Sequence, residues 1–270
     1  MLGAIIGDIV GSTYEFSNIK TKEFPFFTEG SEYTDDSILT LATADWLLHG
    51  GDVARYYSHY AAAHSHPMGG YGTSFAGWVI RSQRRGDFTP YNSCGNGSAM
   101  RVSPVGWAFN TQEEVRAYAK RSAECTHNHP EGIKGAQATA LCILMARQVA
   151  TKHAIQQTME REWGYDLSLT VDELRPRYSW EGLDGHGDGA TCQGSVPQAI
   201  RAFLDGNDFE DCVRNAISLG GDSDTIGCIT GSIAEAYYGI PEDLRQQGMA
   251  FLQPALQQLV EEFENRYGKK

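Results

Sequence analysis

Apolar residues recur every three to four positions over six long stretches of the chain, and this spacing limits the possible folds more than any other feature of the sequence. Such spacing gathers the apolar side chains on one face of an α-helix. Alternating apolar and polar residues, which are typical of strands, are scarce. The stretches are 35–48, 53–63, 113–125, 132–150, 196–204 and 224–238. The sequence therefore predicts an all-α fold, a compact multi-helix body.

Small residues are frequent inside these stretches, most clearly at 132–140, and they allow neighbouring helices to approach closely. Gly, Pro, Asn and Asp collect in breaks at 24–31, 65–72, 88–97 and 183–194, none of which resembles a domain linker. A chain of 270 residues, 41% of them apolar, is long enough to bury one sizeable core. We therefore expect a single domain over residues 1–270, in which the glycine-rich stretch 184–189 is either ordered or a lid.

The net charge of the chain limits the classes of molecule that it is expected to bind. A formal net charge of −12 argues against long nucleic acids, because proteins bind polyanions through clustered Lys and Arg. No apolar stretch is long enough to cross a bilayer, so we expect no membrane partner and a cytoplasmic location. The six cysteines form no C-x-x-C pair, and we interpret them as reduced, structural thiols.

Three acidic clusters lie beside glycine or at the start of a predicted helix: Asp8 with Glu15, Asp35 with Asp36, and Asp222 with Asp224. Carboxylates brought together in a half-buried site repel one another unless cations neutralise them. Oxygen ligands without His or Cys suit Mg²⁺ or Mn²⁺ and match Zn²⁺ poorly. Either helix-start cluster alone is also explained by simple helix capping, with Thr34 and Asp222 as caps.

Taken together, the clusters resemble the ADP-ribosylglycohydrolase family. Its members carry G-D-x-x-G-x-x-x-E, T-D-D-T and G-D-x-D-T in this order, and the chain matches these motifs at residues 7–15, 34–37 and 221–225. The resemblance implies the all-α fold of that family with a dinuclear metal site. The implied metal ligands, for two Mg²⁺ or Mn²⁺ ions, are Thr34, Asp35, Asp36, Asp222, Asp224 and Thr225.

Two further loops, residues 70–72 and 93–101, resemble substrate-binding segments of the family. In a glycine-rich turn that leads into a helix, backbone N–H groups can hold a diphosphate. Without the resemblance, residues 95–97 would be an ordinary tight turn and His127 a cap or surface residue. The implied substrate-binding residues are Gly70, Tyr71, Gly72, Ser93, Gly95, Asn96, Gly97, Ser98, Met100 and His127.

The resemblance also implies an enzyme, one that hydrolyses the glycosidic bond between ADP-ribose and a modified acceptor. Glycosidic cleavage needs carboxyl groups as acid and base, and the candidates are Asp35, Asp36 and Glu15, among which the sequence does not choose. The expected partner is an ADP-ribosylated protein, with arginine as the first acceptor to consider, or a small ADP-ribose conjugate. Serine, a nucleic-acid base and small molecules remain open as acceptors.

The chain departs from the family pattern in two places and in length. Ser37 replaces the usual Thr and keeps the hydroxyl, whereas Gly227 replaces a common Ala, which we expect to loosen helix packing. The chain is short for the family, so the loops that select the acceptor are trimmed. These departures leave the proposed ligands in place and make the acceptor the open question.

Three other functions stay open at this point. One is hydrolysis of another ADP-ribose or nucleoside conjugate by the same architecture. A second is a binding or immunity protein that recognises an ADP-ribosylating toxin, although a pure binder has no need of a complete ligand set. The third is a structural protein that reuses the fold, because a fold alone does not fix function.

Overall fold

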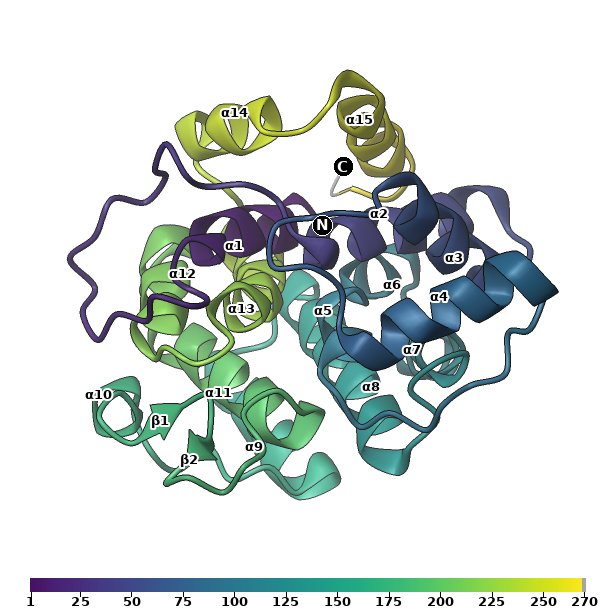
Figure 1. Cartoon of the computed structure of the whole chain (residues 1–270). Coiled ribbons are helices and arrows are strands. Elements are labelled where there is room, and N and C mark those ends of the chain that lie inside the picture. Colours follow the sequence, from purple (N-terminus) through teal and green to yellow (C-terminus); the bar gives the residue numbers. More distant parts are fainter. Residues whose placement is uncertain (269–270) are drawn as a thin grey trace.

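The computed structural model describes residues 1–268 and shows a mostly helical chain (Figure 1). The helices are α1 (Leu2–Ser12), α2 (Asp35–His49), α3 (Val53–Ala63), α4 (Thr73–Arg85), α5 (Gly97–Met100), α6 (Ser103–Ala108), α7 (Gln112–Glu124), α8 (Pro130–Arg147), α9 (Lys152–Trp163), α10 (Val171–Leu174), α11 (Cys192–Asp205), α12 (Phe209–Ser218), α13 (Ser223–Tyr238), α14 (Glu242–Ala250) and α15 (Pro254–Tyr267). Two short strands, β1 (Tyr178–Ser179) and β2 (Gly182–Leu183), pair antiparallel. The all-α prediction is confirmed.

All six predicted helices are present. The bounds of α3 match the prediction, whereas α11 begins before the predicted residue 196, because the Thr191 hydroxyl accepts a hydrogen bond from the Gly194 amide and caps the helix earlier. The spacing does not reveal α1, because every residue of α1 is buried and no polar face interrupts it. It misses α4 for the opposite reason, since only Phe75, Trp78 and Ser82 of α4 are buried.

The helices α1 and α13, from opposite ends of the chain, lie side by side at the centre of the molecule (Figure 1). Glycines line their contact: Gly7 faces Gly227, and Gly3 faces Gly231. A methyl group on Gly227 would lie 2.5 Å from the Gly7 carbonyl oxygen, closer than atoms can pack. The expectation that Gly227 loosens the packing is therefore wrong, because the missing side chain is what allows the two backbones to meet.

The remaining helices surround this central pair. α2, α11 and α12 pack against it, α8 contacts both α11 and α13, and α14 and α15 cover the side shown at the top of Figure 1. Because α1 ends at Ser12 and α13 begins at Ser223, the central contact brings the start of α13 beside the loop that follows α1. The acidic clusters of the sequence lie at this place.

The glycine-rich stretch 184–189 follows the β1–β2 hairpin and is ordered. The Arg177 guanidinium forms a two-point ion pair with the Asp184 carboxylate, and the Gly187 amide donates a hydrogen bond of 2.6 Å to the Glu181 carbonyl oxygen. The stretch is thus tied to the hairpin from which it emerges.

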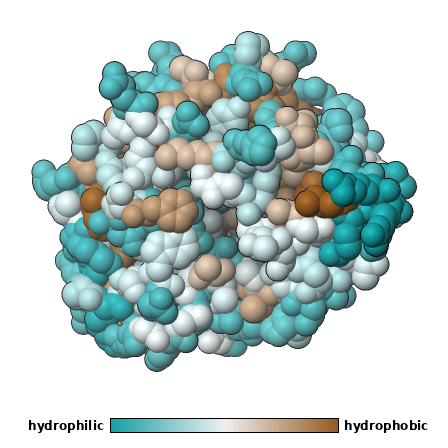
Figure 2. All heavy atoms as spheres, viewed as in Figure 1, coloured by the Kyte–Doolittle hydropathy of each residue, from teal (hydrophilic) through white to brown (hydrophobic). Residues whose placement is uncertain are grey.

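Figure 2 shows a face covered mainly by hydrophilic residues, with small, separate apolar spots. Among residues 1–268, no helix combines the length and the apolar character needed to cross a membrane. All six cysteines are free thiols, and Cys142, Cys192, Cys212 and Cys228 are buried among other core side chains.

Candidate active site

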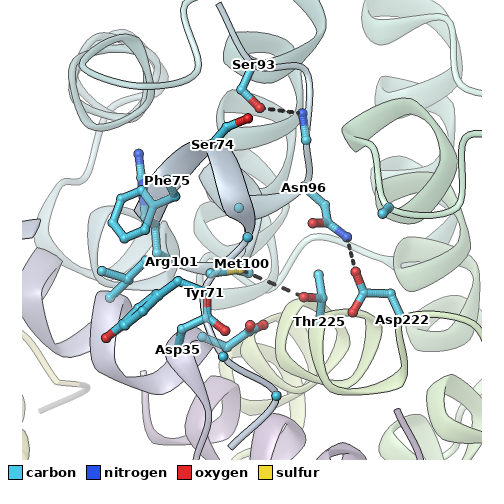
Figure 3. Close-up of a pocket in the computed structure, with 18 of the residues that line it drawn as sticks. Asp35, Tyr71, Ser74, Phe75, Ser93, Asn96, Met100, Arg101, Asp222 and Thr225 are labelled. Carbon is cyan, nitrogen blue, oxygen red and sulfur yellow. Dashed lines mark hydrogen bonds between the residues drawn. The ribbon is translucent and has the colours of Figure 1, made fainter. Parts of the chain in front are cut away.

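A cavity of about 440 Å³ lies where the acidic clusters meet the glycine-rich loops (Figure 3). Its wall is built from the loop after α1, the start of α2, the loop before α4, the loop around α5, the turn before α8 and the start of α13. Fifteen of the seventeen residues predicted for the site belong to this wall: Glu15, Asp35, Asp36, Gly70, Tyr71, Gly72, Ser93, Gly95, Asn96, Gly97, Met100, His127, Asp222, Asp224 and Thr225. Thr34 and Ser98 lie outside it.

Asp8 holds the start of α2 in place. Its carboxylate accepts hydrogen bonds from the Thr34 amide at 3.0 Å, the Thr34 hydroxyl at 2.7 Å and the Ser37 amide at 3.1 Å, and also from the Ser37 hydroxyl. The Thr34 hydroxyl in turn accepts from the Asp36 amide and caps α2. Burial raises the pKa of Asp8 to about 6, although these hydrogen bonds oppose the shift. Asp8, which was not among the predicted site residues, thus positions the acidic residues that follow Thr34.

The side chains of Glu15, Asp222 and Asp224 form a cluster in which one carboxylate oxygen of each lies within 4.8 Å of the others. Asp35 and Asp36 adjoin this cluster across the cavity wall. Three buried carboxylate oxygens of this wall have no hydrogen-bond partner among the described residues: Glu15 Oε2, Asp36 Oδ1 and Asp224 Oδ1. Unpartnered, buried carboxylate oxygens are costly, and divalent cations would compensate them.

Every carboxyl group of this wall is harder to ionise than an ordinary carboxyl. Burial, with the nearby charges of Asp222 and Asp8, raises the pKa of Glu15 to about 7. Burial and neighbouring carboxylates also raise the pKa values of Asp35, Asp36 and Asp224 well above the usual range. The donor set contains only oxygen atoms, so the residues present fit hard cations such as Mg²⁺ or Mn²⁺.

Asn96 connects the glycine-rich loop to the acidic cluster. Its side-chain amide nitrogen donates a hydrogen bond to Asp222 Oδ2 at 2.7 Å (Figure 3) and another to Ser195 Oγ at 3.0 Å. Near them, the Thr225 hydroxyl lies 3.8 Å from the Met100 sulfur (Figure 3). Two segments that are far apart in the sequence are thereby held in one arrangement around the cavity.

The glycine-rich loop supplies fewer free backbone donors than the sequence suggests. The Gly95 amide donates to Ser93 Oγ, and the Asn96 amide donates to the Ala190 carbonyl oxygen. The Gly97 and Ser98 amides, at the start of α5, remain without a helical acceptor. The Ser98 hydroxyl is buried and donates to the Gly132 carbonyl oxygen at 2.7 Å, so it fastens α5 to α8 and does not face the cavity. A substrate-binding role for the Ser98 side chain does not fit this placement.

The loop before α4 forms the opposite part of the wall. Gly70 has a φ of +78°, and a methyl group there or at Gly72 would meet nothing within 4 Å. These glycines therefore leave open space in front of the acidic cluster. Tyr71 lines the cavity (Figure 3), and its hydroxyl donates to the His64 carbonyl oxygen at 2.9 Å.

Several residues that line the cavity were not predicted from the sequence. Ser74, Phe75, Tyr91, Arg101 and Ala190 line the cavity, and Arg101 is fully buried. Arg101 lies within the loop 93–101 that resembles a substrate-binding segment of the family, and this position is the one signal in the sequence. Nothing in the sequence marks Phe75 or Tyr91 as site residues, because an isolated Phe or Tyr is more often a core residue.

Comparisons with known proteins agree with this geometry. The family model described as ADP-ribosylglycohydrolase matches residues 1–270. The chain is 30% identical to ADP-ribosylhydrolase ARH3 of Mus musculus, over 93% of this chain and 86% of that protein. It is 25% identical to ADP-ribosylarginine hydrolase Tri1 of Pseudomonas putida (strain GB-1), over 89% of this chain and 70% of that protein. A solved structure described as an ADP-ribosylglycohydrolase-related protein complex matches with a TM-score of 0.70 and 25% identity, covering 98% of this chain and 97% of that one.

Proposed function

This chain belongs to the ADP-ribosylglycohydrolase family and is an ADP-ribosylhydrolase, and we propose that it releases ADP-ribose from modified arginine side chains of proteins with the help of two Mg²⁺ or Mn²⁺ ions. The observation that carries the proposal is the wall of five carboxyl groups, with Glu15, Asp222 and Asp224 within 4.8 Å of one another, in a cavity of about 440 Å³. A cavity of this size takes a ligand the size of a nucleotide.

Six residues are proposed to hold the ions: Thr34, Asp35, Asp36, Asp222, Asp224 and Thr225. The unpartnered oxygens of Asp36 and Asp224 support this set most directly. When bound, such ions supply electrostatic stabilisation, orient ribose hydroxyls and lower the pKa of coordinated water. Thr34 contributes to the metal site chiefly by capping α2, because its hydroxyl already forms hydrogen bonds with the Asp8 carboxylate and the Asp36 amide.

Glu15 is the acid–base group that the geometry favours over Asp35 and Asp36. Its Oε2 has no hydrogen-bond partner within residues 1–268, its side chain lines the cavity, and its pKa is raised to about 7. A carboxyl group that exchanges a proton near neutral pH suits the protonation of a leaving atom or the activation of water. Asp36 is more deeply buried, and Asp222 is held by Asn96, so both are suited to fixed positions.

Arginine is proposed as the acceptor because one relative is named an ADP-ribosylarginine hydrolase. The name of the ARH3 relatives gives no acceptor. A net charge of −12 favours encounter with basic proteins. This attraction affects the rate of association and does not identify the acceptor residue.

The test is to incubate the purified protein with arginine- and serine-ADP-ribosylated peptides in Mg²⁺, Mn²⁺ or EDTA, and to measure released ADP-ribose by mass spectrometry. Release from the arginine peptide that EDTA abolishes is the expected result. Release from the serine peptide alone would overturn the acceptor and keep the reaction. Release from neither peptide, with metal binding intact by calorimetry, would overturn the proposed reaction on protein substrates.

Variants separate a loss of chemistry from a loss of folding. Asp35→Ala and Glu15→Gln are each expected to lower hydrolysis at least about 100-fold while the helical circular-dichroism signal persists. Asp172→Asn is a matched control, because the Asp172 side chain on α10 is 86% exposed and pairs only with Arg175. Full activity of both site variants would contradict the assignment of these carboxyl groups.

A further inference from the structure

We propose that Arg101, acting through the Thr126 hydroxyl, holds His127 in the tautomer that carries its proton on Nε2, and thereby makes His127 a fixed hydrogen-bond donor for the diphosphate of the ligand. The identity of the ligand rests on the proposed function. The hydrogen-bond chain does not, because it lies within the protein. Arg101 is on this basis a positioning residue, and His127 is the group that touches the ligand.

Arg101 is a buried cation that no carboxylate neutralises. It is fully buried, and no carboxylate of residues 1–268 forms an ion pair with it. Its Nη2 donates to the Ser122 carbonyl oxygen at 3.0 Å and to Thr126 Oγ1 at 2.7 Å, and its guanidinium carbon lies 3.9 Å from the centre of the Tyr57 ring. Arg101 Nε and Nη1 have no hydrogen-bond partner in the part of the chain that the structure describes. A positive charge held this way makes the adjoining cavity wall favourable for an anion.

The direction of the next hydrogen bond follows from the chemistry of the groups. A guanidinium can only donate, so Thr126 Oγ1 accepts from Arg101 and keeps its own hydrogen for another acceptor. His127 Nδ1 lies 2.8 Å from this oxygen. The neighbouring Cys125 thiol is a much weaker acceptor than an imidazole nitrogen. The Thr126 hydroxyl therefore donates to Nδ1, and a neutral imidazole must then carry its proton on Nε2.

The same surroundings keep the imidazole neutral. Burial and the Arg101 charge hold the pKa of His127 well below its usual range. The opposite tautomer would place a proton on Nδ1 and turn it toward an oxygen that already accepts from a cation. It would also leave the Thr126 hydroxyl without a strong acceptor.

His127 Nε2 faces the glycine-rich loop. A methyl group added to Gly97 would lie 3.1 Å from Nε2, and one added to Gly95 would lie 3.6 Å from it. No hydrogen bond among the described residues uses Nε2, and His127 lines the cavity. Nε2–H is thus free to donate a hydrogen bond to a phosphate oxygen of a ligand in the cavity.

The first test reads the tautomer directly in the ligand-free protein. Long-range ¹H–¹⁵N correlation spectra of the protein labelled with ¹⁵N-histidine distinguish a protonated from an unprotonated ring nitrogen, and the spectrum of His127→Gln identifies the His127 signals. The expected result is an unprotonated Nδ1 and a protonated Nε2, retained in Thr126→Ser and replaced by a tautomer mixture in Thr126→Val. A protonated Nδ1 in the wild-type protein would overturn the proposal.

The second test measures ADP-ribose affinity by calorimetry. Thr126→Val is expected to weaken binding about 5- to 30-fold, and Thr126→Ser to restore it. Thr158→Val on α9 is the matched control, because it removes a hydroxyl that bonds only to the Ala154 carbonyl oxygen, far from the cavity wall. Unchanged affinity in a Thr126→Val protein whose tautomer has shifted would overturn the role of His127 as a donor to the ligand.

The two tests keep this inference apart from the proposed function. A wild-type protein that shows the Nε2–H tautomer and does not bind ADP-ribose would contradict the proposed function and leave the Arg101–Thr126–His127 chain standing. The wild-type spectrum decides the tautomer even when Thr126→Val fails to fold.

Discussion

The indole nitrogen of Trp180 donates a hydrogen bond of 2.8 Å to the main-chain carbonyl oxygen of Glu15. The bond joins the β1–β2 hairpin to the loop that carries the proposed acid–base group. The Trp180 ring also lies parallel to the exposed Phe16 ring, with centres 6.0 Å apart. The hairpin therefore fixes the backbone of Glu15, although it contributes no carboxylate to the cavity.

Trp180→Phe removes this hydrogen bond and keeps the ring. We expect hydrolysis to fall about 5- to 10-fold, because the Glu15 carboxyl group is then held less precisely, while the midpoint of thermal unfolding changes little. The measurement is kcat and KM on the best ADP-ribosylated peptide. A variant with unchanged kcat would show that Glu15 keeps its position without the hairpin.

Asp224→Asn is expected to change activity and metal-free stability in opposite directions. Hydrolysis falls at least about 100-fold because a proposed ligand is lost. In EDTA at pH 8 the free energy of unfolding rises by about 1–2 kcal/mol, because a buried carboxylate with an unpartnered oxygen becomes a neutral amide. Urea unfolding with and without Mg²⁺ measures both states. A metal-free variant less stable than the wild type would contradict the repulsion described for this cluster.

The affinity for Mg²⁺ or Mn²⁺ is expected to decrease as the pH is lowered from 8 to 5.5. Because the pKa of Glu15 is raised to about 7, this group carries a proton below that pH, and a cation bound by Asp222 and Asp224, within 4.8 Å of the Glu15 carboxylate, favours release of the proton. The loss approaches about tenfold per pH unit for each proton displaced. The raised pKa also stabilises the metal-free fold at acidic pH, and this contribution disappears as pH rises through about 7. Calorimetry in buffers of different ionisation enthalpy counts the released protons, and equal affinity at both pH values would contradict the prediction.

Gly227→Ala tests the contact between α1 and α13. The new methyl group would lie 2.5 Å from the Gly7 carbonyl oxygen, so the free energy of unfolding should fall by about 2–4 kcal/mol. Gly77→Ala on α4 is the matched control, because nothing lies within 4 Å of the added carbon, and it should stabilise the protein slightly. Similar unfolding midpoints in urea for the two variants would show that the central helices can move apart without cost.

Most of the site could be predicted because its residues occur in short motifs whose order the chain preserves. Asp35, Asp36, Asp222 and Asp224 all reach the cavity, as the motifs imply. The motif letters do not say which way a side chain points. Ser98 is one residue away from a cavity-lining glycine, yet its hydroxyl turns toward α8 and donates to the Gly132 carbonyl oxygen.

The roles that could not be predicted from the sequence depend on contacts between segments that are far apart in the chain. Asp8 was noticed as an acid beside glycine, but its role as the anchor of α2 needs the approach of α1 to residues 34–37. The helix α1 itself carries no periodic pattern, because it is buried on every side. The proposed role of Arg101 depends on the hydrogen-bond chain to Thr126 and His127, and no local sequence pattern connects these residues with Arg101.

The central contact between α1 and α13 has a consequence for synthesis of the protein on the ribosome. The proposed acid–base group, Glu15, is translated well before Asp222 and Asp224, which follow more than 200 residues later in the chain. No nascent chain that stops before α13 contains the cluster, and none can enclose the cavity. The enzyme is therefore inactive until α13 has been synthesised, and it gains activity only when α13 packs against α1.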